Sequence, residues 1–476
     1  MDQTLDPAIT TRAAAGRWRG FEDGARELDD TKLAVSGALP DWLRGGLLLN
    51  GPALWQLPGG GLRHWFDGYA MLHRVAFDGR GGVSYRSRFV ASQAFRDSRA
   101  AGRPVSGEFG TPNPAGLLQR LKGSRATDNP AVVMSRHGRR WFAVSETPYL
   151  TYFDPQTLAT LERLDLHDRL GIELMSAHGF TLDDGSYLNV GVSFGRSCAY
   201  RVFRLPAESS EPQLVAEIAA APPGYLHGFA LAPGHAIVWE CSLRAQVLAM
   251  RFGAAAYKDH FRWQPASGAV LHAVPLAGGA VRSWRIPPLM AFHATQAWAE
   301  GDDLLVEIAA YADASIFDDL TLERRRAGEP LGSPPMLQRY RLQPGRDVAE
   351  PEPLGCSMEL QQVHPAAVGH RRARVCFGIG ASARGDFGDH VLRLDLDRGA
   401  QQRWQRPAAM HLEPLFVPRP GGSADDDGVL LVPTLADDDA ASRIVVLDAA
   451  SMRELASVAA PQVLPFGFHA AFDAAT

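Results

Sequence analysis

Short apolar runs separated by turn signals set the strongest limit on what this chain can fold into. From about Leu39 to the end, runs of four to seven residues such as Trp141–Val144 and Leu304–Ile308 alternate with turn dipeptides such as Asp184-Gly185 and Pro233-Gly234. Short runs between turn residues are typical of antiparallel β-strands. Their number predicts an all-β fold, either a β-propeller or a large sandwich. Because no exact repeat period is visible, we expect a propeller with irregular, loop-rich blades.

We expect a single domain over residues 1–476. The chain is 46% hydrophobic, which is ample for a large core. Length alone suggests about three domains, but closed all-β folds grow by adding blades. No linker divides the sequence, because the polar stretch Gly421–Asp427 is interpreted as a turn between strands. Residues 1–30 are predicted to be an irregular lead-in, and the helical candidates are Asn113–Lys122 and Asp313–Arg326.

Charge and cysteine content argue against several classes of protein. A net charge of −5 gives no electrostatic basis for binding nucleic acid. The four cysteines are scattered without a CxxC pair, which argues against a disulfide framework and fits a reducing compartment. The N-terminus lacks the basic and apolar regions of a signal peptide, and no run approaches the ~18 apolar residues of a spanning helix. We expect a cytoplasmic protein, at most peripheral on a membrane.

Four histidines occupy matching apolar settings. His178, His227 and His293 each lie in an apolar stretch that is followed by a turn and a second strand, and we predict that each is inside the first strand. His469 has the same surroundings close to the C-terminus. One such histidine is usually a satisfied core residue, but four in matching settings indicate a shared metal site. Imidazole suits iron, zinc, copper or nickel, so the pattern alone does not name the element.

Three glutamates complement these histidines. Glu146 follows an apolar strand, Glu359 lies in SMELQQV, and Glu413 lies in HLEPLFVP. Taken singly, each reads as a carboxylate at a strand end in solvent. Taken together, they can accept the second N–H of metal-bound imidazoles, which fixes ring orientation and tautomer. By contrast, Phe66-Asp67-Gly68 is interpreted as a turn that holds a blade together rather than as a metal site.

A set of motifs in order resembles a known family over about Leu39–Phe472. The motifs are Leu49-Asn50-Gly51-Pro52, His64–Leu72, Tyr85–Val90, Thr127–Pro130, Phe153–Leu158, Ala177-His178, Leu226-His227, Phe292-His293, Glu413–Pro418, Asp426-Asp427-Gly428 and Gly467-Phe468-His469. Together they resemble the carotenoid cleavage oxygenases, which include apocarotenoid and stilbene oxygenases and a retinal pigment epithelium isomerohydrolase. Glu108–Thr111 is most similar to the branch that contains the animal carotene oxygenases.

The resemblance implies a seven-bladed β-propeller with a helical, apolar cap over its top face. It also implies a ferrous ion on the axis, with His178, His227, His293 and His469 as ligands. Glu146, Glu359 and Glu413 match the positions of the carboxylates that stand behind the metal ligands in the family. The stilbene-cleaving branch carries a lysine just before the first of these glutamates. Here that position is Ser145, which argues against a phenolic stilbene.

We therefore expect an Fe(II) dioxygenase that uses O2 to cleave a conjugated double bond of a carotenoid or apocarotenoid to aldehydes or ketones. Retinoid isomerohydrolysis with the same iron, stilbene cleavage, and binding of an apolar ligand without catalysis are the alternatives. The resemblance also implies an apolar substrate entrance that contacts a membrane, to which we assign Leu117, Leu118, Leu121 and Phe252. The sequence does not fix the oligomeric state.

Overall fold

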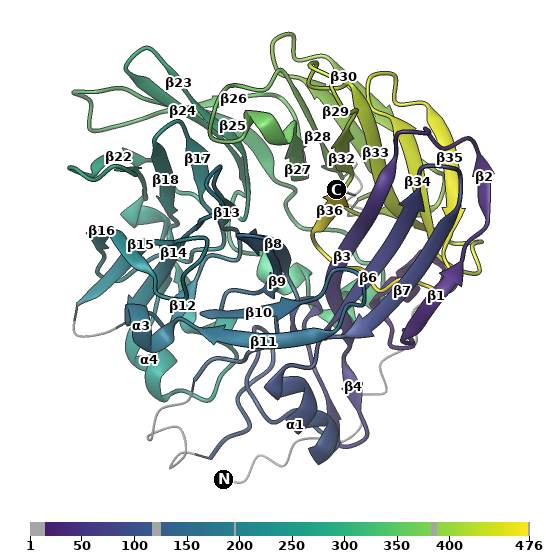
Figure 1. The fold of residues 1–476 in the computed structure, drawn as a ribbon. Helices are drawn as coiled ribbons and strands as arrows, with labels where there is room; N and C mark the ends of the chain where they lie inside the picture. The colour runs from purple at the N-terminus through teal and green to yellow at the C-terminus, as the bar shows by residue number, and fades with distance from the viewer. Residues whose placement is uncertain (1–14, 117–124, 195–196, 382–387, 475–476) are drawn as a thin grey trace.

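The computed structural model describes residues 15–116, 125–194, 197–381 and 388–474. Within these residues, strands form seven sheets of four to six strands each, and every ladder between their named strands is antiparallel. The sheets stand around a common axis as the blades of a propeller (Figure 1). The predicted seven-bladed architecture is confirmed.

Each of the first four blades extends outward from the axis through four or five strands. Blade 1 contains β36 (Ala470–Ala474), β3 (Arg44–Leu54), β6 (Tyr69–Asp78), β7 (Val83–Phe89) and β1 (Leu28–Lys32). Blade 2 contains β8 (Val133–His137), β9 (Arg140–Val144), β10 (Tyr149–Phe153) and β11 (Thr160–Asp165). Blade 3 contains β12 (Leu174–Met175) and β13 (Phe180–Thr181), both paired with β14 (Tyr187–Phe194), then β15 (Cys198–Leu205) and β16 (Gln213–Ala219). Blade 4 contains β17 (Ala230–Ala232), β18 (His235–Glu240), β21 (Ala269–Pro275) and β22 (Arg282–Ile286).

The remaining three blades complete the ring. Blade 5 contains β23 (Ala294–Glu300), β24 (Asp303–Ala310), β25 (Met336–Leu342) and β26 (Pro351–Pro353). Blade 6 contains β27 (Glu359–Val363), β28 (Val375–Gly380), β29 (His390–Asp395) and β30 (Gln401–Trp404). Blade 7 contains β31 (Ala409–His411) and β32 (Leu415–Pro418), both paired with β33 (Gly428–Ala436), then β34 (Arg443–Asp448), β35 (Glu454–Ala459) and β2 (Val35–Gly37).

The two ends of the described chain close the ring by sharing blades. The C-terminal β36 pairs with β3 inside blade 1, and the N-terminal β2 pairs with β35 at the outside of blade 7. The lead-in predicted as irregular over residues 1–30 is ordered in its described part, with η1 at Gly16–Phe21 and β1 beginning at Leu28. Phe21 is fully buried and packs edge-on against Trp65 and Phe466. The two closures leave neither end strand of the ring unpaired.

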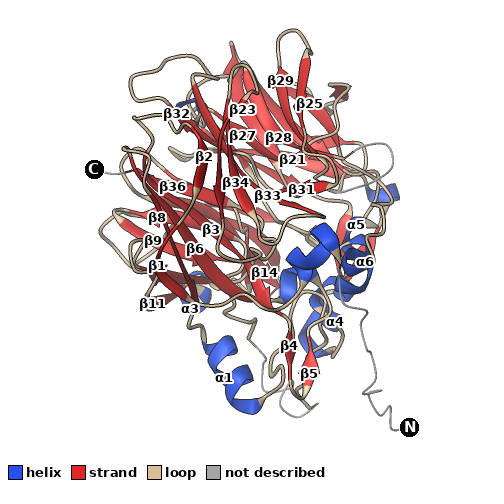
Figure 2. Cartoon of the chain, turned by 90° about the vertical axis from the view of Figure 1, so that its right-hand side faces the viewer, coloured by secondary structure: helices blue, strands red, loops and turns tan. Residues whose placement is uncertain are grey.

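Insertions between strands build a cap over one end of the propeller (Figure 2). They contain the helices α1 (Gln93–Ala101), α3 (His167–Leu170), α4 (Val247–Phe252), α5 (Ile316–Asp319) and α6 (Leu322–Arg326). The 3-10 turns η2 (Trp65–Asp67), η3 (Tyr257–His260) and η4 (Pro265–Ser267) also belong to these insertions, whereas η5 (Pro365–Ala367) connects β27 to β28 within blade 6. Two small sheets pair β4 (Gln56–Leu57) with β5 (Gly60–Gly61) and β19 (Leu243–Ala245) with β20 (Phe261–Trp263).

Of the two helical segments predicted from the sequence, one is confirmed. The candidate Asp313–Arg326 forms α5 and α6. In the candidate Asn113–Lys122, residues 113–116 are not helical, and the rest lies outside the described residues. No helix in the described part of the chain is long and apolar enough to cross a membrane.

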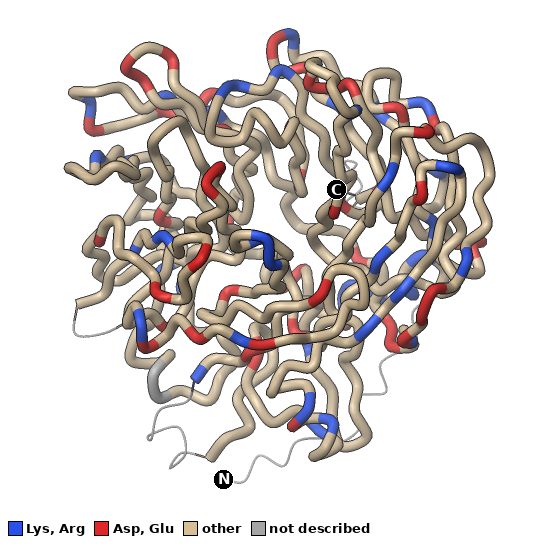
Figure 3. The backbone as a smooth tube through the Cα atoms, viewed as in Figure 1, with Lys and Arg blue, Asp and Glu red and all other residues tan. Residues whose placement is uncertain are grey.

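Charged residues of both signs are interspersed along the outer strands (Figure 3). In blade 1, Arg86 and Arg88 of β7 contact Asp29 of β1 at 3.3 and 3.0 Å, across the ladder between these strands. Exposed pairs of this kind contribute about 0–1 kcal/mol each. The propeller is therefore held mainly by its buried apolar faces, where β33 and most of β34 are inaccessible to solvent.

Candidate metal centre

The four histidines singled out in the sequence meet on the propeller axis. One ring nitrogen from each of His178, His227, His293 and His469 lies within 4.8 Å of the others, and the ring centroids of His178 and His469 are 4.4 Å apart. Metal–nitrogen bonds of about 2.1 Å place ligands on opposite sides of an ion about 4.2 Å apart. The spacing of the four nitrogens therefore suits a single ion.

The prediction that these histidines lie inside strands is wrong. Each precedes an innermost strand by one to three residues: His178 precedes β13, His227 precedes β17, His293 precedes β23 and His469 precedes β36. Side chains within a strand point to the two faces of its sheet, and in a propeller these faces pack against neighbouring blades. A residue beside the strand end is free of that alternation and can point along the axis.

His178 lies in an interruption of the innermost strand of blade 3. Strands β12 and β13 both pair with β14, and Ser176–Gly179 lies between them. Opposite the gap, the side-chain amide of Asn189 donates to the carbonyl of Ser176 at 3.0 Å. The extra residues bend the chain away from the ladder, as in a β-bulge, and this bend turns His178 toward the axis.

Glu413 and Glu359 lie at similar irregularities. Strands β31 and β32 both pair with β33, and Glu413 lies in the gap between them. Pro433 of β33 stands opposite this gap, and proline has no N–H to donate to a ladder. In blade 6 the register between β27 and β28 shifts after Glu359, where Leu360 has a φ of 51°. Both carboxylates are buried at the axis because the inner strands are irregular there.

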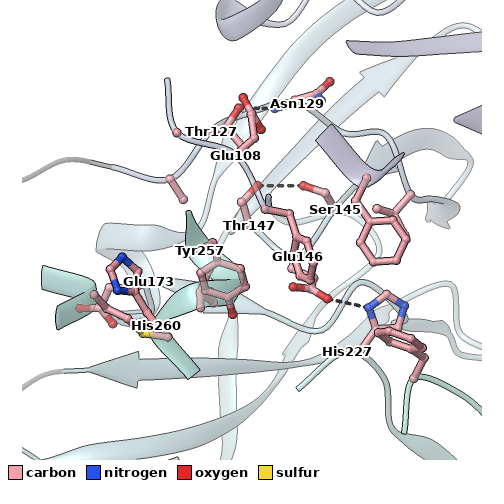
Figure 4. A pocket seen from close by; sticks show the side chains of 18 of the residues that line it. Glu108, Thr127, Asn129, Ser145, Glu146, Thr147, Glu173, His227, Tyr257 and His260 are labelled. Atoms are coloured by element: carbon pink, nitrogen blue, oxygen red, sulfur yellow. Dashed lines mark hydrogen bonds and ion pairs between the residues drawn. The ribbon is translucent and has the colours of Figure 1, made fainter. Parts of the chain in front are cut away.

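Three of the histidines are each paired with one of the predicted glutamates. Nδ1 of His227 lies 2.6 Å from Glu146, Nδ1 of His293 lies 2.6 Å from Glu359, and Nδ1 of His469 lies 2.9 Å from Glu413. Figure 4 draws the contact between Glu146 and His227 as a dashed line. With each Nδ1–H donating to a carboxylate, each Nε2 carries the lone pair that a metal requires. Each of the seven blades contributes one residue to this group of four histidines and three glutamates. In order from blade 1 to blade 7, these are His469, Glu146, His178, His227, His293, Glu359 and Glu413.

The glutamates have further partners that the sequence did not indicate. The hydroxyl of Tyr225 donates to Glu146, and that of Tyr311 donates to Glu359 at 2.9 Å. The amide of Gln362 donates to Glu413 at 2.9 Å, and so does the backbone N–H of Ala470 at 2.6 Å. Tyr225 stands two residues before His227, so a search for polar side chains around each histidine could have found it. Nothing in the sequence pairs Tyr311 or Gln362 with its carboxylate.

His178 is positioned through the backbone, and no carboxylate pairs with it among the described residues. Its N–H donates to the hydroxyl oxygen of Ser176 at 3.0 Å, and this hydroxyl donates to the carbonyl of His227 at 2.8 Å. The N–H of Ala177 donates to the same carbonyl at 2.9 Å. Ser176 therefore couples the loops that carry two of the four histidines.

The protonation of the site favours a divalent cation. Burial, with the neighbouring histidines, lowers the pKa of His178 and His227 well below the usual value, so both rings are neutral donors. Burial raises the pKa of Glu146 to about 8, against the lowering effect of the Tyr225 hydroxyl. The Nε2 atoms of His178 and His293 are buried without a hydrogen-bond partner. A cation would use these lone pairs, and its charge would favour the ionised form of the nearby Glu146. Four imidazoles do not by themselves select the metal.

A cavity of about 620 Å³ reaches from the histidines to the cap. His227, His293 and His469 line it, whereas His178 is not among its lining residues. Aromatic side chains in its wall include Phe66, Phe109, Tyr257, Phe292 and Phe468. The hydroxyls of Ser145 and Thr147 lie 3.2 Å apart in the wall, next to Glu146 (Figure 4). Its size falls within the range of small-molecule sites.

The predicted entrance is described only in part. Leu117, Leu118 and Leu121 lie outside the described residues. Phe252 ends α4, but its side chain is not described. Two other residues of α4, Val247 and Met250, line the cavity. The role of these leucines and of Phe252 therefore stays a prediction.

Comparison with known proteins places the chain in a family. The family model described as retinal pigment epithelial membrane protein matches residues 21–474. Carotenoid cleavage dioxygenase 8 homolog A, chloroplastic, of Oryza sativa subsp. japonica is 33% identical over 505 residues, covering 98% of this chain and 89% of that protein. The mitochondrial carotenoid-cleaving dioxygenase of Homo sapiens is 26% identical over 508 residues, covering 92% of this chain and 87% of that protein.

Solved structures agree with the sequence relatives. A Glu-to-Gln variant of Synechocystis apocarotenoid oxygenase superposes with a TM-score of 0.84 at 26% identity, covering 96% of this chain and 98% of that one. A cobalt-substituted form of the same oxygenase gives a TM-score of 0.83 at 26% identity, again covering 96% and 98%. The propeller and its axial histidines define a metal-dependent β-propeller enzyme. The chain belongs to the carotenoid cleavage oxygenase family.

Proposed function

We propose that the protein is a non-haem Fe(II) dioxygenase that cleaves a conjugated C=C bond of a carotenoid or apocarotenoid. The observation that carries this proposal is the group of four histidines, three of which line a large cavity with several aromatic side chains in its wall. Membership of the carotenoid cleavage oxygenase family supports the same chemistry. In the overall reaction, the alkene and O2 give two carbonyl products, and no proton is gained or lost.

The residues of the site would hold a ferrous ion, which supplies the redox chemistry toward O2 when bound. Glu146, Glu359 and Glu413 fix the orientation of three imidazoles by accepting their Nδ1–H groups. Because the reaction moves no proton overall, these carboxylates need not act as general bases. Their charge balances the cation in a buried site where water cannot do so.

The cavity wall supplies position and excludes water. Phe292 packs edge-on to His227, with ring centroids 5.1 Å apart, and Phe66, Phe109 and Phe468 continue the wall toward the cap. A long conjugated ligand gains burial against such rings without polar contacts. Holding one double bond beside the histidines reduces the entropic part of the barrier.

Cleavage predicts that the iron-loaded protein consumes O2 and releases carbonyl products. We expect incubation with β-carotene and with several apocarotenals to give, for at least one of them, two aldehydes or ketones identifiable by mass, in proportion to the O2 taken up. Rearrangement of a retinyl ester without O2 uptake would instead establish isomerohydrolysis. A protein that binds these polyenes but converts none with iron present would be a binding protein, contrary to the proposal.

Stilbene cleavage is disfavoured by the wall of the cavity. Ser145 occupies the position where the stilbene-cleaving branch carries a lysine, and no lysine is among the described residues that line the cavity. A resveratrol-like substrate in the same assay tests this, and we expect no cleavage of it.

We further propose that the cap rests on a membrane surface near α4. Leu248 is 76% exposed, while Val247 and Met250 of the same helix line the cavity. We expect Leu248→Asp to weaken co-sedimentation with anionic vesicles by about tenfold or more, because inserting one leucine is worth ~1.5–3 kcal/mol. Leu214→Asp is the matched control, since Leu214 is 54% exposed on β16 of blade 3. Equal sedimentation of both variants and wild type would contradict docking at α4.

A further inference from the structure

A carboxyl group outside the metal centre also lines the cavity. Glu108 belongs to the segment Glu108–Thr111 between α1 and β8, and its side chain is only 5% exposed. It lies among the residues that form the cavity wall, where Figure 4 shows it beside Thr127 and Asn129. Glu146, Glu359 and Glu413 each face a histidine, but Glu108 has no such partner among the described residues, so its place in the wall requires another explanation.

Glu108 has few donors to stabilise a negative charge. The hydroxyl of Ser106 donates to its Oε1 at 2.9 Å, and the side chain of Thr127 supplies a second hydrogen bond. No lysine, arginine or histidine pairs with it among the described residues. A buried carboxylate without a cation is costly, and such groups are commonly kept neutral instead.

Two neighbouring carboxyl groups are stabilised much better. Asp67 accepts from the N–H of Gly110 at 2.8 Å, the hydroxyl of Thr111 at 2.6 Å, and the N–H of His64 at 3.1 Å. These contacts hold the turn at η2, as predicted for the Phe66-Asp67-Gly68 segment. Multiple donors of this kind favour the ionised form of a carboxyl group.

The other neighbour, Asp128, accepts from the N–H groups of Gln93 and Ala94 at 2.9 and 2.8 Å. It also pairs with Arg163 at 2.7 Å. Asp67 and Asp128 therefore have their charge compensated, whereas Glu108 does not.

Charge and burial together keep Glu108 protonated. Burial, with the nearby Asp67 and Asp128, raises the pKa of Glu108 to about 8. Below that pH the group carries an O–H that can donate one hydrogen bond. The side chain of Asn129, its neighbour in the wall, is already engaged in hydrogen bonds within the protein. Its amide N–H donates to the carbonyl of Gly68, and its oxygen accepts from the N–H of Ala70.

Glu108 lies in the same cavity as the histidines but away from them, so it can contact the end of a long ligand whose middle lies beside the histidines. In Figure 4, Ser145 and Thr147 lie between Glu108 and the pair formed by Glu146 and His227. A rod-shaped polyene with a double bond beside the histidines extends along the cavity, and a donor away from the metal centre can meet an atom at its terminus.

We propose that Glu108 donates a hydrogen bond to the oxygen of a carbonyl or hydroxyl end group on the substrate. This rests on the proposed function, because it assumes that the ligand is a polyene. It assigns the substrate to the oxygen-bearing apocarotenoids rather than to the hydrocarbon carotenes. Glu108 is thus a specificity-determining residue that binds the end group and takes no part in the reaction at the metal.

The test is binding to the metal-free protein, measured with a detergent-dispersed apocarotenal and with β-carotene as the hydrocarbon control. Glu108→Met removes the donor at nearly constant volume, and we expect it to weaken apocarotenal binding by about 3- to 10-fold while leaving β-carotene unchanged. Glu108→Gln keeps a donor and should bind the apocarotenal within about twofold of wild type. In wild type and in Glu108→Gln, but not in Glu108→Met, the bound aldehyde should absorb at longer wavelength, as a hydrogen-bonded conjugated carbonyl does.

The pH dependence provides a second readout. Because the pKa of Glu108 is raised to about 8, its O–H is present below that pH and lost above it. Apocarotenal binding by wild type should therefore weaken above about pH 8 more than binding by Glu108→Met does. Burial places the pKa of Asp67 at about 6 and that of Tyr69 at about 12. The pKa of Glu146, which lines the same cavity, is also raised to about 8, but Glu146 is present in both proteins, so the difference between the two pH profiles reports Glu108.

The outcomes separate this inference from the proposed function. A protein that binds the apocarotenal through Glu108 but cleaves nothing with iron supports the inference and overturns the proposed function. A protein that cleaves carotenoids while Glu108→Met binds both ligands as wild type does overturns the inference alone. Failure of the wild-type protein to bind either ligand overturns both.

Discussion

Replacing His227 with alanine is expected to remove most of the bound iron and to abolish turnover. The wild-type protein should hold about one iron per chain. His227 is buried between the cavity and the axis, and its loss leaves three imidazoles and a Glu146 carboxyl with no ring to orient. Metal analysis of the purified protein, together with O2 uptake on a carotenoid substrate, measures both effects. Full turnover by the variant would rule out the four-histidine site.

Two further variants show whether the effect is specific. His235→Ala is the matched control, because His235 lies in blade 4 on β18 and its Nδ1 lies 3.1 Å from the carbonyl oxygen of Pro233, outside the group of four axial histidines. It should retain iron and activity. Glu413→Gln keeps the shape of a group that orients His469, and it should lower metal affinity or activity by about 10- to 100-fold. We therefore expect the loss of iron and activity to be largest for His227→Ala, intermediate for Glu413→Gln and absent for His235→Ala. These different effects distinguish a metal ligand from a residue that orients a ligand.

The number of blades followed from a family resemblance rather than from periodicity. The rhythm of short apolar runs correctly predicted antiparallel strands and a ring-like fold. It could not count blades, since their inner strands vary from the two residues of β12 to the seven of β23, and long insertions interrupt blades 4 and 5. Because the blades differ in strand and loop length, the sequence contains no repeat of fixed length.

The histidines could be predicted because each lies in a recognisable apolar setting, whereas the three glutamates were assigned by their match to the motifs of the family. Their exact placement could not, because it depends on irregular inner strands. Ladder rules alone place His178 within a strand, yet the gap between β12 and β13 moves it to the axis. Whether a strand is interrupted depends on the residues opposite, such as Asn189, and these become neighbours only after folding.

The residues that donate hydrogen bonds to the glutamates were harder to predict from the sequence than the glutamates themselves. Tyr311 ends a stretch already identified as a hairpin, but it meets Glu359 of the next blade across 48 residues of sequence. Gln362 meets Glu413 across 51 residues in the same way. Contacts between blades join residues that are far apart in the sequence, so no local sequence pattern predicts them and they become visible only in the folded structure.

Deleting residues from Leu464 onward is expected to destabilise the whole propeller as well as to remove iron. β36 pairs with β3 from Gly45 to Leu49, so its loss exposes an inner strand edge and opens blade 1. The deletion also removes Leu464, Phe466 and Phe468, all buried. Losing a core side chain of this size costs about 2–5 kcal/mol, and a folded domain has only about 5–15 kcal/mol in total. We expect the thermal midpoint to fall by about 10 °C or more.

Two smaller changes separate ring closure from metal binding at this end of the chain. His469→Ala keeps β36 and should lose iron with a much smaller change in thermal midpoint. Deleting residues from Ala470 onward keeps His469 but removes β36, and should lower the midpoint and release iron together. The second effect follows because the N–H of Ala470 holds Glu413 at 2.6 Å, and Glu413 orients His469. If the deletion from Ala470 stays folded and retains its iron, then β36 does not close the ring on which the site depends.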